Sequence, residues 1–162
     1  MNLKKLFETQ EQLNDRILSE HKLENHDLFA EKQLAFLVEL SELANETRCF
    51  KYWSKKGPSS KSTILEEYVD GLHFVLTLGL SLGYTTFGQS KNSSKERTLT
   101  EQFLYVMECN HLLNEKQTEA SFHELAQSFL TLGSLLGFGE DEIEQAYFKK
   151  NEVNHQRQDQ GY

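Results

Sequence analysis

Glu67-Tyr-Val-Asp-Gly-Leu-His-Phe-Val-Leu-Thr-Leu-Gly-Leu80 is the stretch that decides the fold. Its apolar residues cover most of the circumference of a helix, which is typical of a helix at the centre of a fold. We therefore predict a central helix over about 63–83. The remaining stripe on that helix, at the spacing of one face, consists of Glu67, Asp70, Phe74, Thr77 and Ser81.

A second acidic pair, Glu39-Leu-Ser-Glu42, lies on the preceding predicted helix. Residues three apart on a helix share a face with Cβ atoms about 5–6 Å apart, so each pair aims two carboxylates at one point. Ala35, Phe36 and Leu43 flank Glu39 on a helical wheel, which places these acids inside or at the edge of the apolar sector. Carboxylates gathered there repel each other unless cations or protons compensate. One such pair is typical of an acidic surface helix, whereas two pairs on packed helices predict a divalent-cation site.

Length and composition indicate one all-α domain over 1–162, a bundle of about six helices. The chain of 162 residues has a single proline, and its apolar residues recur at three- and four-residue spacing. Further helices are predicted over about 3–19, 28–50, 99–115, 119–136 and from Glu140 onward. Residues 59–63 are suited to cap the central helix, and 84–98, rich in Gly, Ser and Asn, are predicted to be a mobile loop.

Charge and cysteine usage restrict the partners and the compartment. The net charge of −8 argues against a nucleic-acid binder, because no broad basic field is present to meet a phosphate backbone. The longest apolar run, 72–82, is too short to span a bilayer, and the N-terminus lacks the apolar core of a signal peptide. Cys49 and Cys109 have no CxxC spacing. These features fit a protein of the reducing cytoplasm that does not bind a membrane.

Three further polar patterns suit a ligand. Gln10 with Asn14, or Gln12 with Asn14, can present amides to a base edge, since amides both donate and accept hydrogen bonds, although solvent-facing amides are the common case. A basic and aromatic cluster surrounds 51–56 and can contact phosphate or simply complement a helix C-terminus. On the last helix a stripe with two cations and several amides predicts a phosphate-and-sugar clamp, with a frayed tail as the alternative. This stripe consists of Tyr147, Lys150, Asn151, Asn154, Arg157 and Gln158.

Five separated segments together resemble one known family, the dimeric all-α dUTP pyrophosphatases, which belong with the MazG-like nucleotide pyrophosphohydrolases. The segments are Gln12-Leu-Asn14, Glu39-x-x-Glu42, Phe50-Lys-Tyr-Trp53, Glu67-x-x-Asp70 followed by His73-Phe74, and Lys150-Asn151-x-x-Asn154-x-x-Arg157-Gln158-x-x-Gly161-Tyr162. The two acidic pairs mark the wider superfamily. The aromatic-lysine motif, the His-Phe pair and the C-terminal segment narrow the resemblance to deoxyuridine nucleotides.

The resemblance implies a homodimeric enzyme that hydrolyses dUTP to dUMP and pyrophosphate, with dUDP as a second candidate substrate. It implies that Mg²⁺ is held by Glu39, Glu42, Glu67 and Asp70, and that Glu39 lies nearest the attacking water. Phe74 would pack under the sugar or base and leave little room for a 2′-hydroxyl. The implied phosphate contacts are Lys51, Lys150 and Arg157. The implied base and sugar contacts are Gln12, Asn14, Trp53, His73 and Asn154, with Asn151 in the same C-terminal motif.

Several alternatives stay open at the level of the sequence. Glu66 rivals Glu67 as a ligand, and Gln10 rivals Gln12 in the first motif. A dCTP or broad-specificity nucleotide pyrophosphohydrolase would share the acidic site, because base choice rests on a few amide contacts. A ferritin-like dinuclear metal protein is suggested by Glu108-Cys-Asn-His111, although that arrangement needs two such helices. The non-enzymatic alternative is a helical interaction module whose acidic residues merely lie on its surface.

Overall fold

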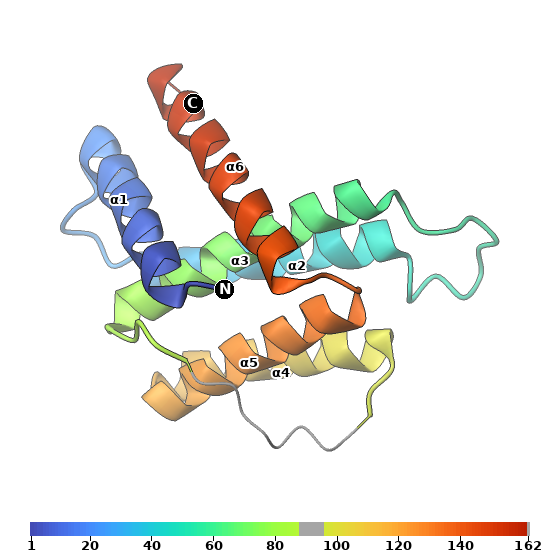
Figure 1. Cartoon of the computed structure of the whole chain (residues 1–162). Helices are drawn as coiled ribbons and strands as arrows, with labels where there is room; N and C mark the ends of the chain where they lie inside the picture. Colours follow the sequence, from blue (N-terminus) through green and yellow to red (C-terminus); the bar gives the residue numbers. More distant parts are fainter. Residues whose placement is uncertain (88–95, 162) are drawn as a thin grey trace.

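The structure is a computed structural model that describes residues 1–87 and 96–161. These residues form six α-helices and no strand (Figure 1), which confirms the prediction of an all-α fold. The helices are α1 (Leu3–His21), α2 (Phe29–Thr47), α3 (Lys61–Leu82), α4 (Leu99–Lys116), α5 (Glu119–Leu135) and α6 (Glu140–Asp159).

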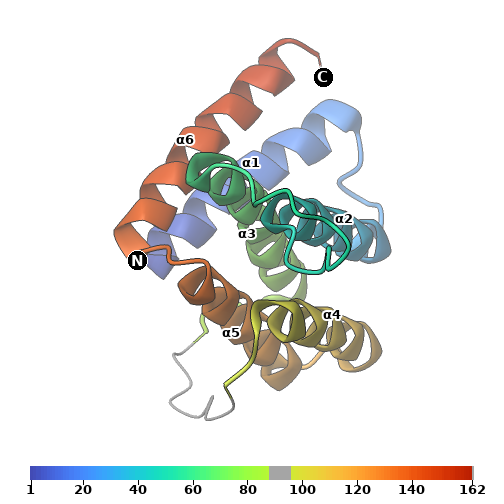
Figure 2. The same ribbon diagram turned by 90° about the vertical axis from the view of Figure 1, so that its right-hand side faces the viewer.

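The helices are arranged in three layers of two. The antiparallel hairpin of α2 and α3 forms the middle layer, with α1 and α6 on one side of it and the α4–α5 hairpin on the other (Figures 1 and 2). Helix α3 packs against α1, α2, α5 and α6. The helix that was predicted to be central is therefore the one that contacts both outer layers.

The sequence of α3 explains why it occupies this position. Six of its apolar residues are buried and belong to one core cluster with side chains of the other helices, and its other apolar residues are partly buried against that cluster. A helix with apolar side chains around most of its circumference can bury all of them only if it lies between two layers. The buried apolar residues of α3 are Tyr68, Val69, Leu72, Val75, Leu76 and Leu78.

Close approach of α5 to α3 depends on glycine at Gly133. A Cβ atom at this position would lie 2.5 Å from the Tyr68 hydroxyl oxygen and 2.6 Å from ring atom Cζ. Tyr68 stacks on Phe129 with ring centroids 4.6 Å apart and donates a hydrogen bond of 3.2 Å to the Phe129 carbonyl. The α3–α5 contact thus fixes the orientation of the helix that carries the acidic residues.

The helix ends agree with the predictions except at the end of α2. We predicted this helix to continue to Phe50, but it ends at Thr47 because Arg48 adopts a left-handed conformation with φ of 58°. The Arg48 guanidinium then donates hydrogen bonds to the Lys56 carbonyl at 3.1 Å and to Ser54 Oγ at 2.7 Å. These bonds shape residues 48–60 into an ordered loop. Ser60 caps α3, as the polar segment before it indicated, by accepting a hydrogen bond from the backbone N–H of Thr63 at 3.2 Å.

The segment 84–98 is described only in part. Residues 84–87 and 96–98 have no helix or strand, and Phe87 is buried in the core. The rest of the predicted mobile loop, 88–95, lies outside the described residues. None of the described helices combines the length and the apolar character that crossing a bilayer requires.

Candidate functional site

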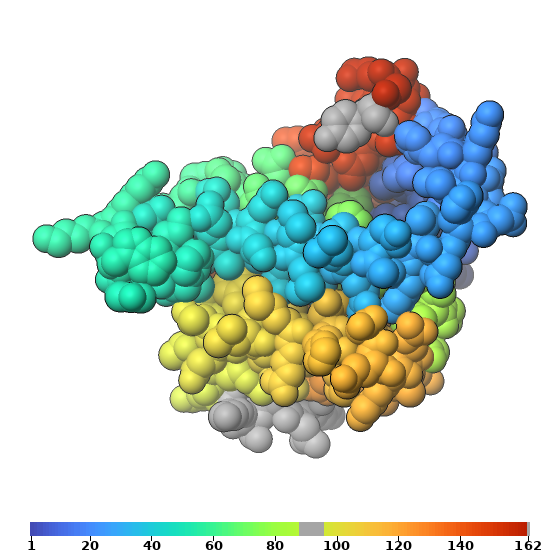
Figure 3. Space-filling model, turned by 180° about the vertical axis from the view of Figure 1, so that it is seen from behind, coloured from blue at the N-terminus to red at the C-terminus, as the bar shows by residue number. Residues whose placement is uncertain are grey.

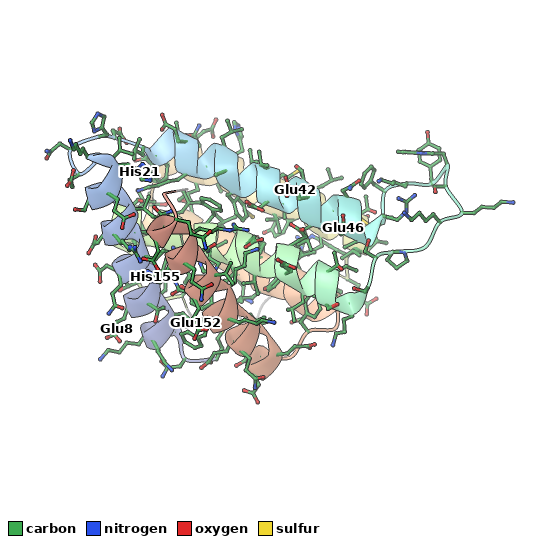
Figure 4. The ribbon with its side chains drawn as sticks, turned by 90° about the horizontal axis from the view of Figure 1, so that it is seen from above. Glu8, His21, Glu42, Glu46, Glu152 and His155 are labelled. Carbon is green, nitrogen blue, oxygen red and sulfur yellow. The ribbon has the colours of Figure 1, made fainter. Side chains whose placement is uncertain are left out.

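A cavity of about 500 Å³ lies between α1, α2, α3 and α6. Figure 4 looks down on this region, which the α2–α3 hairpin borders on one side and α1 and α6 on the other. A cavity of this size accommodates a small organic ligand of drug size or a nucleotide. Its polar lining includes Gln10, Asn14, Glu31, Lys32, Glu39, Asp70, His73, Thr77, Asn154, Arg157 and Gln158, and its apolar lining includes Leu13, Ile17, Ala35 and Phe74.

Three carboxylates meet beside the cavity, and two of them, those of Glu39 and Asp70, line it. One carboxylate oxygen from each of Glu39, Glu67 and Asp70 lies within 4.8 Å of the others, and all three side chains are half-buried. Glu39 comes from α2, whereas Glu67 and Asp70 lie one turn apart on α3. The i,i+3 spacing on α3 and the packing of α2 against it produce this arrangement. We refer to these three residues as the acidic centre.

Burial and mutual repulsion leave the acidic centre short of positive charge. Burial raises the pKa of Glu39 to about 7, and the charges of its acidic neighbours add to this shift. The pKa values of Glu67 and Asp70 are also raised, in both cases mainly by burial. Groups that are held close together while their charged forms are disfavoured create a demand for a cation.

The two remaining acids beside the centre differ in role. Glu42 is exposed on α2, where Figure 4 labels it, and lines a shallow groove on the outer side together with Glu67. Its charge raises the pKa values of Glu39 and Glu67, so it is electrostatically part of the site although it is not one of the three converging ligands. Glu66 is exposed and pairs with Lys150 instead. The i,i+3 spacing to Asp70 favours Glu67 over Glu66, which agrees with this placement.

Lys150 reaches the acidic centre from α6, which lies in the outer layer that packs on α3 (Figure 1). Its Nζ atom donates hydrogen bonds to Asp70 Oδ2 at 2.7 Å and to Glu66 Oε1 at 3.2 Å. Burial opposes its charged form, but the hydrogen bonds and charges of these acids outweigh burial and raise its pKa. The ammonium group is therefore protonated and neutralises part of the centre.

A buried polar network lies farther along the cavity. Gln10 Oε1 lies 2.7 Å from His73 Nδ1 and accepts a hydrogen bond of 2.8 Å from the Tyr147 hydroxyl. Gln10 Nε2 donates to Asn14 Oδ1 at 3.0 Å, and Thr77 Oγ1 donates to the same oxygen at 3.2 Å. Burial, with a contribution from the charge of Lys150, lowers the pKa of His73 to about 3, so the imidazole is neutral. The network joins α1, α3 and α6.

The structure brings some of the predicted substrate residues together and leaves others outside. Asn14, His73, Phe74, Asn154 and Arg157 line the cavity, and Lys150 contacts its acidic end. Asn151 is buried on α6 but does not line the cavity.

Gln12, Lys51 and Trp53 lie outside the cavity. Gln12 is exposed on α1, and Gln10 takes the position beside Asn14 because residues four apart share a helix face. Lys51 and Trp53 lie on the 48–60 loop at the far end of the α2–α3 hairpin (Figure 1), where Lys51 pairs with Asn45 and Trp53 is 65% exposed.

Two residues of α2, Glu31 and Lys32, line the cavity without having been predicted. Burial lowers the pKa of Lys32, whose Nζ donates a hydrogen bond of 2.8 Å to Ser81 Oγ. The signal that was available is spacing, because Glu31, Ala35 and Glu39 follow one another at intervals of four. The alternative metal motif, Glu108 with His111, is not supported: both are exposed on α4, and the only carboxylate, imidazole and thiol cluster of metal-ligating size among the described residues is the acidic centre.

The comparison with known families agrees with this geometry. A family model described as dUTPase matches residues 2–162. The chain belongs to the dUTPase family. It is accordingly a hydrolase of nucleotide metabolism that acts on dUTP, and the resemblance found in its sequence is confirmed. Members of this family generally depend on a divalent metal, for which the acidic centre is the candidate site. The search of curated proteins gave no match.

Proposed function

We propose that the acidic centre holds Mg²⁺ and that this dUTPase cleaves dUTP to dUMP and pyrophosphate at the adjoining end of the cavity. The donor set supports this choice of metal, because it offers only carboxylate oxygens, the hard ligands that Mg²⁺ prefers. The raised pKa values of Glu39, Glu67 and Asp70 support it as well, since a bound dication stabilises their charged forms. Glu42 joins the site from the outer groove as a further ligand or counter-charge.

The order of residues along α3 supports a single orientation of the nucleotide. Asp70, Phe74 and Thr77 follow each other along one face, and from Asp70 to Thr77 the helix rises by about 10 Å. The triphosphate would therefore lie at Asp70, the deoxyribose at Phe74, and the base between Thr77 and Asn14. Phe74 is half-buried. Its ring would supply a flat apolar surface at the sugar and leave little room for a 2′-hydroxyl.

Residues of α6 are suited to hold the phosphates and the sugar. Lys150 and Arg157 are the cations of the stripe, and each lies at the acidic centre or in the cavity lining. Cations bind phosphate oxygens through charge-assisted hydrogen bonds. Asn154 lines the cavity between them along the helix and can meet a sugar hydroxyl or a phosphate oxygen. Asn151 is buried behind these residues, so we propose that it supports the helix surface rather than touching substrate.

The reaction needs one water molecule and one proton acceptor. We assign the acceptor role to Glu39, which belongs both to the acidic centre and to the cavity lining. Its carboxylate would orient the water and take its proton while the water oxygen bonds to phosphorus and the linkage between the α- and β-phosphates breaks. Bound Mg²⁺ supplies charge neutralisation of the triphosphate and alignment of the reacting groups.

We also propose that the enzyme is a cytoplasmic homodimer without affinity for nucleic acid. Leu34 and Val38 of α2 and Leu104 of α4 are 64%, 46% and 62% exposed, and α2 lies directly above α4 on the face shown in Figure 3. A second copy on this face would cover the groove in which Glu42 lies, and it gives the 48–60 loop, with Lys51 and Trp53, a partner chain to contact. The net charge of −8 fits a protein without affinity for nucleic acid. The two free cysteines fit a cytoplasmic location.

Pyrophosphate release from dUTP, dCTP, dTTP and UTP, with Mg²⁺ and with a chelator, tests the proposal. We expect turnover of dUTP that requires Mg²⁺ and falls by at least about a hundredfold in Asp70→Asn, since loss of a metal ligand costs no less than loss of its supporting shell. Glu108→Gln is the matched control and should keep full activity.

Each contrary result has a distinct meaning. Metal-dependent turnover mainly of dCTP would keep the acidic centre and discard the uracil assignment. Full activity of Asp70→Asn, or loss of activity in Glu108→Gln, would contradict the proposed centre itself.

A further inference from the structure

The Tyr147 hydroxyl is fully buried at the junction of α6, α1 and α3. Burial raises the pKa of Tyr147 well above its usual range, so the phenol keeps its proton. Its oxygen lies 2.8 Å from Gln10 Oε1 and 3.3 Å from the Leu6 carbonyl, and we assign the closer Gln10 oxygen as its acceptor. The ring also stacks on His73 with centroids 4.3 Å apart. Tyr147 therefore contacts the Gln10 amide oxygen and also His73, the other partner of that oxygen, without lining the cavity itself.

This donor orients the Gln10 amide and thereby the hydrogen bonds that Gln10 makes to His73 and Asn14. Because Gln10 Oε1 faces Tyr147, it accepts a second hydrogen bond from the neutral His73, whose proton must then reside on Nδ1. The amide nitrogen of Gln10 necessarily faces the other way and donates to Asn14 Oδ1 at 3.0 Å. Thr77 donates to the same oxygen at 3.2 Å. Asn14 Oδ1 thus accepts two hydrogen bonds, one for each of its lone pairs.

Asn14 is left with its amide nitrogen directed elsewhere. The oxygen is held by Gln10 and Thr77, and Asn14 Nδ2 donates to no acceptor within the described part of the chain. This nitrogen is not one of the fully buried atoms without a partner, so it is not fully enclosed by protein. Asn14 lines the cavity. The network thus presents a hydrogen-bond donor of fixed direction in the region that we assign to the base.

We propose that Tyr147 is a positioning residue for base selection, which acts through Gln10 to hold the Asn14 amide with its nitrogen toward position 4 of the pyrimidine. This inference rests on the proposed function. Uracil carries a carbonyl acceptor at position 4, whereas cytosine carries an amino donor there. A fixed donor is satisfied by the first and opposed by the second, and a buried polar group left without its partner is costly.

Tyr147→Phe removes one hydroxyl and leaves the ring that stacks on His73. We expect the ratio of kcat/KM for dUTP to that for dCTP to fall by about fivefold to tenfold, the effect of one hydrogen bond, because the amide pair is no longer held in one direction. Tyr68→Phe is the matched control: it also removes a fully buried hydroxyl that donates to a single acceptor, but it lies in the α3–α5 contact away from the network. Its ratio should equal that of the wild type.

A second measurement reads the network without any substrate. The ¹⁵N chemical shifts of the His73 ring should show the proton on Nδ1 in the wild type and in Tyr68→Phe, and a mixture of tautomers in Tyr147→Phe. A proton on Nε2 in the wild type would mean that the amides point the opposite way, and it would overturn the inference.

The assay separates failure of this inference from failure of the proposed function. If the wild type turns over dUTP but Tyr147→Phe keeps the wild-type ratio, or if Tyr68→Phe loses discrimination equally, the positioning role is wrong and the function stands. If the wild type shows no turnover of dUTP, the proposed function fails and base selection by Tyr147 fails with it.

Discussion

The carboxylate of Glu39 links sequence pattern to chemistry at the scale of single residues. Its place within an apolar sector indicated that it would be buried, and burial raises its pKa to about 7. A metal-free protein can relieve this by taking up a proton or by recruiting an ammonium group, as Lys150 does for Asp70. A dication satisfies all three acids at once, which is why the same residues that destabilise the metal-free site suit the metal-bound one.

The pH dependence of the metal-free protein follows from this shift. Glu39 binds its proton more tightly when folded, with a pKa of about 7, than at its ordinary value of 4.5. Between these values the folded state holds more protons than the unfolded state, so the stability contributed by this group falls as pH rises from about 4.5 to about 7. With a chelator present, thermal unfolding should therefore show a smaller loss of stability between pH 5 and pH 7.5 in Glu39→Gln than in the wild type. An unchanged pH profile in this variant, with Glu108→Gln as control, would refute the assigned shift.

Single residues also show where sequence reasoning stops. The i,i+3 spacing predicted Glu67 with Asp70, because both lie on one helix. The choice between Gln10 and Gln12 depends on how α1 is rotated against α3 and α6, which no local pattern specifies. Gln10 is selected by its contacts with His73 and Tyr147, residues far away along the chain.

At the scale of helices, α6 is the element of the outer layer that contributes a cation to the acidic centre on α2 and α3. Its stripe of cations and amides was predicted from spacing alone, but the contact of Lys150 with Asp70 was not, since it requires the crossing of α6 over α3. The helix bounds, which were predicted mainly from apolar spacing, agree with the structure except at Arg48. That residue ends α2 early by adopting a backbone conformation that the sequence does not single out.

Lys150 should compete with the metal for the acidic centre. Replacing it in Lys150→Met removes the ammonium while keeping most of the side-chain length. We expect tighter Mn²⁺ binding without nucleotide, by roughly fivefold, because no cation has to be displaced from Asp70. We expect KM for dUTP to rise by about tenfold, because a phosphate contact is lost. Calorimetric titration and steady-state kinetics measure the two effects, with the exposed neighbour Lys149→Met as control. Weaker metal binding in Lys150→Met would contradict the competition.

At the scale of the whole molecule, the three layers leave the α2 edge of the middle layer exposed (Figure 3). Apolar residues at three- and four-residue spacing predicted an all-α core, and the resemblance implied a homodimer without locating its contact surface. The structure places the exposed apolar residues Leu34 and Val38 on α2 beside Leu104 on α4. The sequence did not indicate this, because exposure on α2 depends on which of its faces α3 covers.

This surface yields a prediction about oligomeric state. Leu34→Glu combined with Leu104→Glu places two charges on the proposed contact, where they would have to be buried without partners. Sedimentation velocity should show a dimer for the wild type and a monomer for this variant. Val153→Glu, a charge on a partly exposed site of α6, should stay dimeric. A wild type that sediments as a monomer, or a double variant that remains dimeric, would show that the subunit contact lies elsewhere or does not form.

The most direct test of the central claim is the position of the metal. Crystals grown with Mn²⁺ and a dUTP analogue in which an imido group replaces the oxygen between the α- and β-phosphates would locate the ion by anomalous scattering. We predict anomalous peaks among the carboxylates of Glu39, Glu67 and Asp70, with the base of the analogue beside Asn14. Peaks at other residues, or an analogue bound outside this cavity, would contradict the proposed active site.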